Sequence, residues 1–490
     1  MPSPFRFFSV TNAPDTGITF NYGRLHVKGD VLADPGLFQD LNFPTVEFGQ
    51  AGLQAEQHFS AAGTLTLQTS LTLQGGTLSF GRLENSNQLD WQTGTVNVTR
   101  AGGLEVGNDG SFGAVLTLFP QQTLNATADG SLSTVDPIGR LRLQDAATLS
   151  ADGMTNNGEI QLAGSTARLT PRPGEPSGLG LTNNGLVRGE GRIDHAVTNN
   201  AGGELRADGG DRLVLTGDLS ANSGTVNITD GGRLDVLGSL TSDGSVNVQG
   251  ATLSVSDSAT NQANGSLSVT NGSAFFNGGL TNQGDLVVGS DDADLYGDIN
   301  NQAGARISAA GGATATLHDA LTNNGEVVVT SGSRLVVLGD ASGGGNYPGA
   351  GTVEFASGFS PGNSPGSVTF GGDVALQGTT DLVFEAASLA QGSSYDHIDV
   401  AGNLQTAGTL TLMLLDGFQP GAGDAFDLLD FGSLEGGFDT LNLPALDGGL
   451  SWDTSQLQAI GSLQVIPEPA TTGLVLLGAL GLVVAWRRRA

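Results

Sequence analysis

The sequence predicts an all-β protein built around a long parallel β-helix, with ~20 residues in each coil. Three observations predict this fold. A short phrase recurs at a steady spacing, turn dipeptides such as SG, DG, NG and GG separate short apolar alternations, and no stretch before residue 470 shows a helical stripe longer than about two turns. Gly contributes 77 of the 490 residues and Pro only 17, which is typical of a chain that turns often.

The recurring phrase consists of a glycine followed by alternating apolar residues. Successive copies are 19 to 21 residues apart, and they begin at Gly203, Gly224, Gly244, Gly265, Gly284, Gly304 and Gly325. Looser copies such as GTLTL at Gly63 and GEIQL at Gly158 extend the pattern toward the N-terminus. A fixed period of this length is typical of a solenoid, in which each repeat forms one coil.

Each repeat is predicted to contain two or three short strands. In SGTVNITDGGRLDVLGSL, Val226 and Ile228 alternate with polar residues, and Leu234 and Val236 repeat the alternation after a tight turn. A period of two places such residues on one face of a strand, so we expect these four side chains to point into the core.

The repeats and the composition together predict four regions. These are an irregular segment or cap over 1–50, the solenoid over 51–345, a β-rich C-terminal capping unit over 346–464 and a tail over 465–490.

Asparagine is prominent in turns such as LTNNGL and LTNQGD. Asn tolerates the left-handed conformation and Gly adopts it freely, so both residues suit tight corners. Stacked Asn side chains are also expected to hydrogen-bond from coil to coil. A structural role is therefore favoured over ligand binding.

The composition excludes several classes of function. The formal net charge is −30, and Lys28 is the only lysine. Such an acidic chain repels phosphate groups, so nucleic acid is not an expected partner. The absence of cysteine excludes disulfides and thiolate sites, and no motif indicates a cofactor.

The tail contains an apolar segment between a proline-rich triplet and three arginines. Residues 470–486 carry no charge and would form a helix of about 26 Å, enough for a thin bilayer. Arg487, Arg488 and Arg489 follow at once. The sequence thus predicts a transmembrane helix over 470–486 whose arginines remain in the cytoplasm.

The order of these parts, Pro467, Glu468 and Pro469, then the apolar span, then the arginine cluster, resembles the PEP-CTERM sorting signal. The resemblance covers the last 26 residues. It implies recognition by an exosortase in the inner membrane of a Gram-negative bacterium that makes exopolysaccharide. It also implies processing near the triplet and delivery of the body to the cell surface or extracellular matrix. The prolines keep the triplet extended and outside the helix, where a protease can reach it.

Three phrases in the predicted capping unit, PGNSPG, YDHIDVAG and GTLTLMLLDGF, resemble the C-terminal part of autotransporter passenger regions. That resemblance implies a surface-exposed β-solenoid. At the other end, MPSPFRFFSVTNAPDTGITF lacks the apolar run of a secretory signal peptide. Either the natural start lies upstream of Met1, which we favour, or the gene is degraded or the chain has been trimmed.

Candidate sites for chemistry are few. Asp291, Asp292 and Asp294 form, with Asp298, a weak calcium candidate in GSDDADLYGD, although the spacing of known calcium loops is missing. The five histidines are scattered, without paired spacing. The densest basic patch is expected either to meet acidic sugars or, preferably, to pair with Glu190, Asp194 and Asp208; it consists of Arg188, Arg192, Arg206 and Arg212.

These observations favour a non-enzymatic structural or adhesive surface protein that associates with exopolysaccharide or biofilm. The alternative is a β-helical polysaccharide lyase or hydrolase that uses the same sorting route, since several enzymes of that kind share the fold.

Overall fold

The computed structural model describes residues 24–26, 31–32, 45–48, 58–66, 71–127, 132–172, 179–362 and 365–468. The chain divides into two compact units, residues 1–300 and residues 301–490. Throughout the described ranges the regular structure is β-strand, apart from a 3-10 turn η1 (Ser86–Gln88) and a four-residue helix α1 (Leu457–Ile460).

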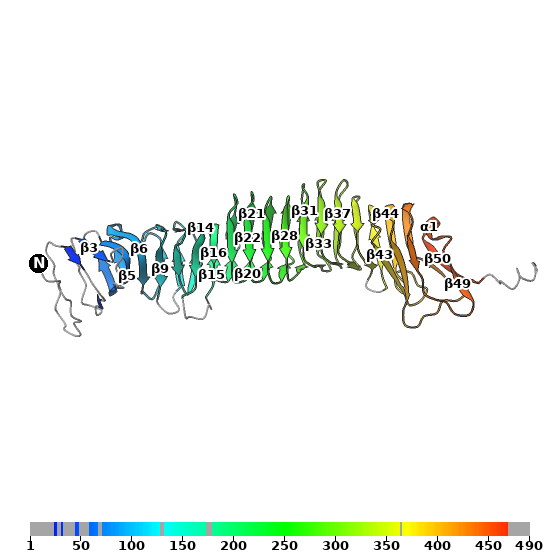
Figure 1. Ribbon diagram of the computed structural model, residues 1–490, viewed down its shortest axis with the longest axis horizontal. Coiled ribbons are helices and arrows are strands. Elements are labelled where there is room, and N and C mark those ends of the chain that lie inside the picture. The colour runs from blue at the N-terminus through cyan, green and yellow to red at the C-terminus, as the bar shows by residue number, and fades with distance from the viewer. Residues whose placement is uncertain are drawn as a thin grey trace, which may run out of the picture. The chain divides into compact units, whose positions relative to one another are not determined.

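The first unit is a parallel β-solenoid whose strands stack in three columns (Figure 1). The first column contains β8 (Val115–Leu118), β11 (Arg140–Gln144), β14 (Glu159–Thr170), β16 (Leu186–Ile193), β18 (Glu204–Ala207), β21 (Thr225–Thr229), β24 (Ser245–Gln249), β27 (Ser266–Thr270) and β30 (Asp285–Val288). The second contains β9 (Gln122–Ala126), β12 (Thr148–Ser150), the later parts of β14 and β16, β19 (Arg212–Leu215), β22 (Arg233–Val236), β25 (Thr252–Val255), β28 (Gly272–Phe276) and β31 (Ala293–Tyr296). The third contains β7 (Glu105–Val106), β10 (Leu132–Val135), β13 (Gly153–Asn156), β15 (Leu181–Asn183), β17 (Val197–Asn199), β20 (Leu219–Asn222), β23 (Leu240–Ser242), β26 (Ala259–Asn261) and β29 (Leu280–Asn282).

Parallel pairing in this unit begins earlier than the predicted start at residue 51. Strand β1 pairs with β3 and β3 with β5, so the coil pattern reaches into the first fifty residues. The early strands are β1 (Arg24–His26), β2 (Val31–Leu32), β3 (Thr45–Phe48), β4 (His58–Thr66), β5 (Leu71–Glu84) and β6 (Leu89–Val98).

The core of the first unit forms where the alternation in the sequence predicts it. Val226, Ile228, Leu234 and Val236 are all buried, and the polar Asn227 between Val226 and Ile228 faces outward. Equivalent positions on adjacent coils are about 20 residues apart: Asn222 meets Ser242 after 20 residues and Asn261 meets Asn282 after 21. The predicted all-β parallel solenoid is confirmed.

The second unit repeats the three-column arrangement. Its first column contains β33 (Arg306–Ala309), β36 (Glu326–Val329), β41 (Ser367–Phe370) and the earlier parts of β44 (His397–Thr406) and β47 (Leu429–Gly436). Its second contains β34 (Thr314–Leu317), β37 (Arg334–Val337), β39 (Thr352–Phe355), β42 (Asp373–Leu376) and the later parts of β44 and β47. Its third contains β35 (Leu321–Asn323), β38 (Ala341–Gly343), β40 (Phe359–Pro361), β43 (Asp381–Ala386), β45 (Thr409–Leu414) and β48 (Thr440–Asn442). Strand β32 (Ile299–Asn301) contains the division between the two units.

The change of rhythm after residue 345 is not a change of fold. Parallel pairing in the second unit continues through β39 and β42 to β47 and β48. The coils grow longer instead: Asn301 meets Asn323 after 22 residues, whereas Asp381 meets Thr411 after 30. The extra residues lie in loops between strands. A search for copies spaced ~20 residues apart therefore does not recognise these longer coils as repeats.

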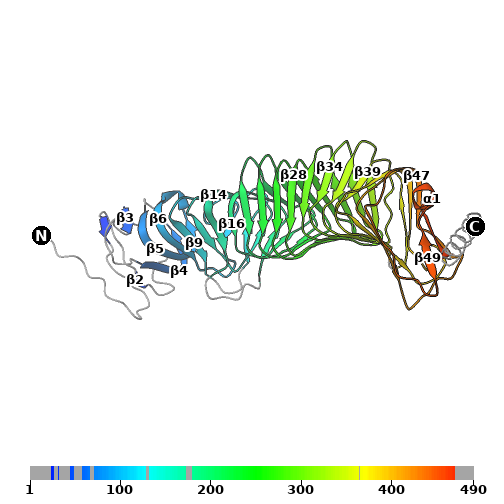
Figure 2. The ribbon, with the colours of Figure 1, turned by 45° about the vertical axis from the view of Figure 1, so that its right-hand side comes forward.

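A small antiparallel sheet follows the last coil and differs from the rest of the fold. Its order is β46 (Ala425–Asp427), β50 (Ser462–Pro467) and β49 (Leu450–Asp453), with β50 in the centre. Helix α1 packs against β47 and β50 (Figure 2). The N–H groups of Leu428 and Leu429 donate to the carbonyl of Gly461, which attaches this sheet to the final coil.

Candidate functional site

The first two residues of the proline triplet lie at the end of a folded strand. Val465 is fully buried in β50, while Pro467 and Glu468 are exposed. Pro467 stands opposite Leu450 of β49, and the Glu468 N–H donates to the carbonyl of Gly449 at 2.8 Å. The antiparallel sheet therefore fixes the triplet's upstream side in an extended conformation, as the prolines predict.

The rest of the tail lies outside the described residues. This applies to Pro469, to the predicted transmembrane helix over 470–486 and to Arg487, Arg488 and Arg489. Within the ranges that the structure describes, no helix has the length and apolar character needed to cross a membrane.

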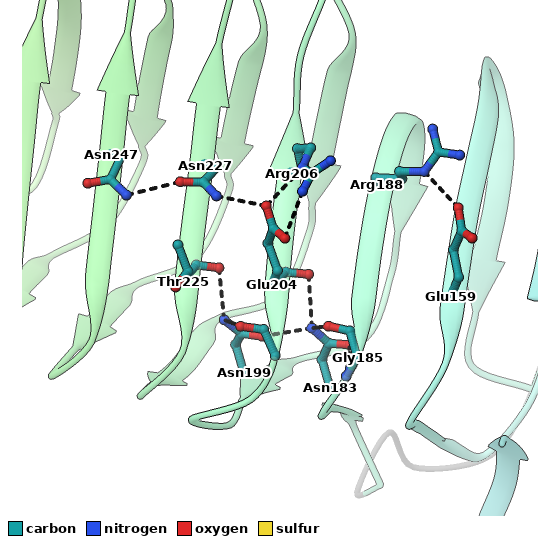
Figure 3. Close-up of polar contacts among 11 residues, drawn as sticks. Glu159, Asn183, Gly185, Arg188, Asn199, Glu204, Arg206, Thr225, Asn227 and Asn247 are labelled. Atoms are coloured by element: carbon teal, nitrogen blue, oxygen red, sulfur yellow. Dashed lines mark hydrogen bonds and ion pairs between the residues drawn. The ribbon is translucent and has the colours of Figure 1, made fainter. Parts of the chain in front are cut away.

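A row of buried asparagines runs along one corner of the first unit (Figure 3). Asn183 donates to Asn199, and Asn199 donates to Asn222, each over 2.7 Å between amide nitrogen and amide oxygen. Each amide also meets the backbone: Asn183 donates to the carbonyls of Gly185 and Glu204, and Asn199 to that of Thr225. The predicted coil-to-coil stacking of Asn side chains is confirmed.

The prediction that these corner asparagines adopt the left-handed conformation is wrong. Asn183 and Asn199 do not have positive φ angles, whereas Asp230 and Asn271 do. The corner glycines are needed for close approach instead, because a Cβ on Gly185 would lie 2.2 Å from the Gly158 carbonyl oxygen. Since the asparagine side chains are fully buried, they form structure and leave no face for a ligand.

The arginine patch forms ion pairs, but mostly with other partners than expected. Arg188 Nε lies 2.7 Å from Glu159 on the preceding coil, a carboxylate outside the predicted set of Glu190, Asp194 and Asp208. Arg206 makes two hydrogen bonds of 2.8 Å to Glu204, which is also outside that set (Figure 3). Burial acts to raise the pKa of Glu204, yet hydrogen bonds from Arg206 and Asn227 hold that pKa below its ordinary value.

The two remaining arginines of the patch lie in the second column. Arg192 pairs with Asp194, as predicted. Arg212 Nε contacts Asp235 at 2.6 Å, and the same carboxylate accepts a 2.7 Å hydrogen bond from Arg233. Sequence spacing could not identify these partners, because they are set by which residues oppose each other on adjacent coils.

The acidic turn proposed as a weak calcium candidate begins after β30 and extends into β31. Asp291 and Asp292 are exposed and Asp294 is partly exposed. Across the described part of the chain, no three side chains of His, Asp or Glu lie close enough together to hold a metal ion. Asp291, Asp292 and Asp294 are therefore not gathered around a common point.

One constellation in the second unit was missed by sequence reasoning. His397 lies with Nδ1 3.3 Å from the Ser367 Oγ and Nε2 3.2 Å from an oxygen of Asp430. These residues come from adjacent strands β41, β44 and β47, and Ser367 and Asp430 are exposed. Recognising that the coils lengthen to about 30 residues would have revealed the alignment, since Ser367 and His397 are 30 residues apart.

Asp396, in the phrase YDHIDVAG, is a buried carboxylate with a structural role. Its two oxygens accept hydrogen bonds from the N–H groups of Gly366 at 2.6 Å and Glu385 at 2.8 Å. Burial raises the pKa of Asp396 to about 6, against the effect of these two hydrogen bonds. The carboxylate thus joins three segments of the second unit.

Comparison with known proteins gives a match to a family model, a partial match to a curated protein and a likeness to solved structures. Residues 465–489 match the model of the PEP-CTERM protein-sorting motif. The chain is 26% identical over 220 residues to the tRNA nuclease CdiA-2 of Burkholderia pseudomallei (strain 1026b), which covers 41% of this chain and 7% of that protein. The Haemophilus influenzae Hap adhesin is similar at 12% identity and a TM-score of 0.24, covering 84% of this chain and 64% of that one.

The two relatives carry little weight for function. This chain spans only 7% of the length of the curated relative, so nuclease activity is not carried over. The fold assignment rests on strand pairing within each unit and not on the distant structure. The motif match and the solenoid together indicate an exported surface protein. The chain is a β-solenoid protein that carries a PEP-CTERM protein-sorting motif at residues 465–489.

Proposed function

We propose that this chain is an exported, non-enzymatic structural or adhesive protein of the surface or extracellular matrix of a Gram-negative bacterium. An exosortase recognises Pro467, Glu468 and Pro469. Residues 470–486 hold the precursor in the inner membrane, with Arg487 to Arg489 on the cytoplasmic side. After processing, the body associates with exopolysaccharide or biofilm.

The observation that carries this proposal is the continuity between a folded strand and the sorting motif. The family match begins at residue 465, inside β50, and Val465 is fully buried there. A processing enzyme at the membrane face thus meets a triplet whose upstream side is already ordered by β49. Processing on the far side of Glu468 would release the folded body intact.

The outer faces of the coils supply a surface suited to many weak contacts. Thr225 and Asn227 on β21 recur as Ser245 and Asn247 on β24, in register. Hydroxyl and amide groups can hydrogen-bond to sugar hydroxyls. Repetition from coil to coil makes such contacts additive, so a weak individual contact yields useful total affinity.

Peptide mass mapping of the native protein tests this proposal. The protein is recovered separately from inner membrane, outer surface and medium of the producing cells. We expect surface and medium fractions whose last peptide ends between Pro467 and Ala470, with no peptide from GLVLLGALGLVV.

A matched variant sharpens the result. The substitutions Pro467→Ala and Pro469→Ala together should leave the uncleaved protein in the inner membrane, while Pro361→Ala, far from the motif, should be processed normally. An intact tail in every fraction of the unaltered protein would contradict sorting.

The alternative is a polysaccharide lyase or hydrolase on the same sorting route, and one observation favours a hydrolytic form that acts on ester bonds of substituted sugars. Ser367, His397 and Asp430 place a hydroxyl next to an imidazole that also meets a carboxylate. Such an arrangement can activate serine for attack on an ester. If the unaltered chain hydrolyses p-nitrophenyl acetate, and Ser367→Ala abolishes this while the exposed Ser433→Ala does not, the alternative gains support. Absence of turnover in the unaltered chain would reject this ester-cleaving form.

A further inference from the structure

Arginine is concentrated in one part of an otherwise acidic chain. The sequence contains 18 arginines, and nine of them lie between residues 140 and 235. Eight of these nine occur on six strands of the first unit, namely Arg140, Arg142, Arg168, Arg188, Arg192, Arg206, Arg212 and Arg233 on β11, β14, β16, β18, β19 and β22. The same strands carry only four carboxylates, Glu159, Glu190, Glu204 and Asp235.

These arginines lie on the outward sides of the first and second columns, which β14 and β16 join into one sheet; this surface is here named the arginine face. On β16 the buried residues Val187 and Ile193 alternate with the outward Arg188 and Arg192. Strands β14 and β16 run through both columns, and β11, β18 and β19 pair with them in parallel. The net formal charge of the six strands is +4, whereas the whole chain carries −30.

Folding alone does not account for this placement. Three pairs of arginines stand directly opposite each other on adjacent strands: Arg188 with Arg206, Arg168 with Arg192, and Arg212 with Arg233. Like charges in directly opposed positions destabilise a sheet. The chain has few basic residues, yet it places arginines in these opposed positions. Binding to an external partner explains this placement better than folding does.

Two carboxylates on the face are each shared by two arginines, whereas Arg206 and Arg192 pair singly with Glu204 and Asp194. Glu159 is shared by Arg140 and Arg188, and the buried Asp235 is shared by Arg212 and Arg233. Each trio retains one positive charge.

The guanidinium groups also keep hydrogen-bonding capacity. The side chains of Arg188, Arg212 and Arg233 each donate one hydrogen bond through Nε (Figure 3 for Arg188). Their terminal nitrogens make no hydrogen bond to the described part of the chain. The exposed Arg142 and Arg168 form no ion pair with any described residue. A planar guanidinium with free terminal N–H groups is suited to bind a carboxylate.

We propose that the arginine face binds an acidic polysaccharide through the carboxylates of its sugar units. Successive coils repeat at about 4.8 Å, so a flexible chain with one carboxylate per sugar can meet several arginines along the face. Nucleic acid fits less well, because residues 140–235 contain no Phe, Trp or Tyr for base stacking and the chain's net charge repels dense phosphate. This proposal rests on the proposed association with exopolysaccharide, and it names the chemical class and the site.

The test measures binding of the full chain to polygalacturonate by isothermal titration calorimetry. The variant Arg142→Gln with Arg168→Gln removes two exposed charges and no ion pair within the described chain, so folding should be preserved, as circular dichroism can verify. We expect at least a fivefold loss of affinity in this variant and further weakening with salt. Arg82→Gln with Arg306→Gln changes net charge equally at exposed positions outside the face and should have little effect.

Several outcomes would overturn the proposal. An equal loss in both double variants would show a general charge effect, and no loss in either would place binding elsewhere. Equal affinity for duplex DNA, for vesicles of anionic lipid or for neutral dextran would reject an acidic polysaccharide as the specific partner. Failure of the unaltered chain to bind polygalacturonate would reject the arginine face, while sorting and matrix location would still be decided separately by mass mapping.

Discussion

At the scale of single residues, the first unit depends on amides that are buried and almost completely hydrogen-bonded. Asn199 is fully buried, accepts from Asn183 and donates to Asn222 and to the Thr225 carbonyl. A buried polar group without a partner destabilises the folded state, whereas a satisfied one is nearly neutral. Each corner asparagine is therefore specified by its neighbours on adjacent coils.

Replacing Asn199 tests this dependence. Asn199→Ala leaves the Asn222 amide oxygen and the Thr225 carbonyl without this donor, so we expect a loss of about 1–3 kcal/mol in stability. The exposed Asn200→Ala, which removes only a surface contact to Asn184, should change stability by less than about 0.5 kcal/mol. The midpoint of urea denaturation, followed by circular dichroism, distinguishes the two. Equal midpoints would show that the buried row contributes nothing.

The buried carboxyl of Asp396 predicts a pH dependence of the second unit. Burial raises its pKa from an ordinary value of 3.8 to about 6, so the protonated form is favoured in the folded chain. The resulting stabilisation is fully present below pH 3.8 and is lost as the pH rises through 6. The difference between the two pKa values corresponds to roughly 3 kcal/mol at most.

The variant Asp396→Asn cannot ionise and should lack this dependence. Between pH 4 and pH 7 we expect the unaltered chain to lose stability relative to Asp396→Asn, as measured by denaturation midpoints at each pH. The substitution Asp399→Asn, at an exposed position on the same strand, serves as the control. Its denaturation midpoint should change with pH in the same way as that of the unaltered chain. A constant difference between Asp396→Asn and the unaltered chain would contradict the shift.

At the scale of secondary-structure elements, the antiparallel sheet of the second unit determines how the sorting motif is presented. β50 is its central strand, with Leu463 and Val465 fully buried. Trp452 on β49 donates from Nε1 to the Pro444 carbonyl at 2.8 Å, and its ring lies 5.7 Å from that of Phe426 between centroids. Together with the pairing of β49 with β50, these contacts hold β49 in the sheet next to the triplet.

Weakening β49 should expose the motif. Trp452→Ala removes the aromatic contact and the hydrogen bond, so we expect faster cleavage by a non-specific protease around residues 462–468. Gln464→Ala, an exposed position on β50, should behave like the unaltered chain. Limited proteolysis with mass spectrometry gives the measurement. Unchanged cleavage in Trp452→Ala would show that β49 does not protect the segment.

At the scale of the whole molecule, charge is the dominant property. A net charge of −30 makes the molecules repel one another at neutral pH. The repulsion vanishes as the carboxylates are protonated.

The predicted solubility profile follows from this charge. We expect a minimum near pH 4.1, the isoelectric point of the sequence, with recovery on either side. Light scattering across pH 3 to 7 gives the profile. A chain that remains fully soluble at pH 4.1 would show that features other than net charge keep its molecules apart.

Much of this architecture is accessible from the order of residues because solenoid contacts repeat locally. The spacing of 19 to 21 residues between glycines predicts the length of one coil. The alternation of apolar and polar residues predicts buried positions such as Val226 and Ile228. The asparagine stacking followed from the same repetition. The sorting motif is likewise a short linear pattern, so it is readable without any fold.

The tertiary structure decided the features that depend on register between coils. Only the alignment of β14 with β16 shows that Arg188 binds Glu159, since these residues are 29 apart in the chain. Likewise, only the lengthened coils bring Ser367 to His397. Local periodicity fixes which way a side chain points. Which side chain it meets is fixed by strand pairing, and the physical reason is that the loops between strands contain variable numbers of residues.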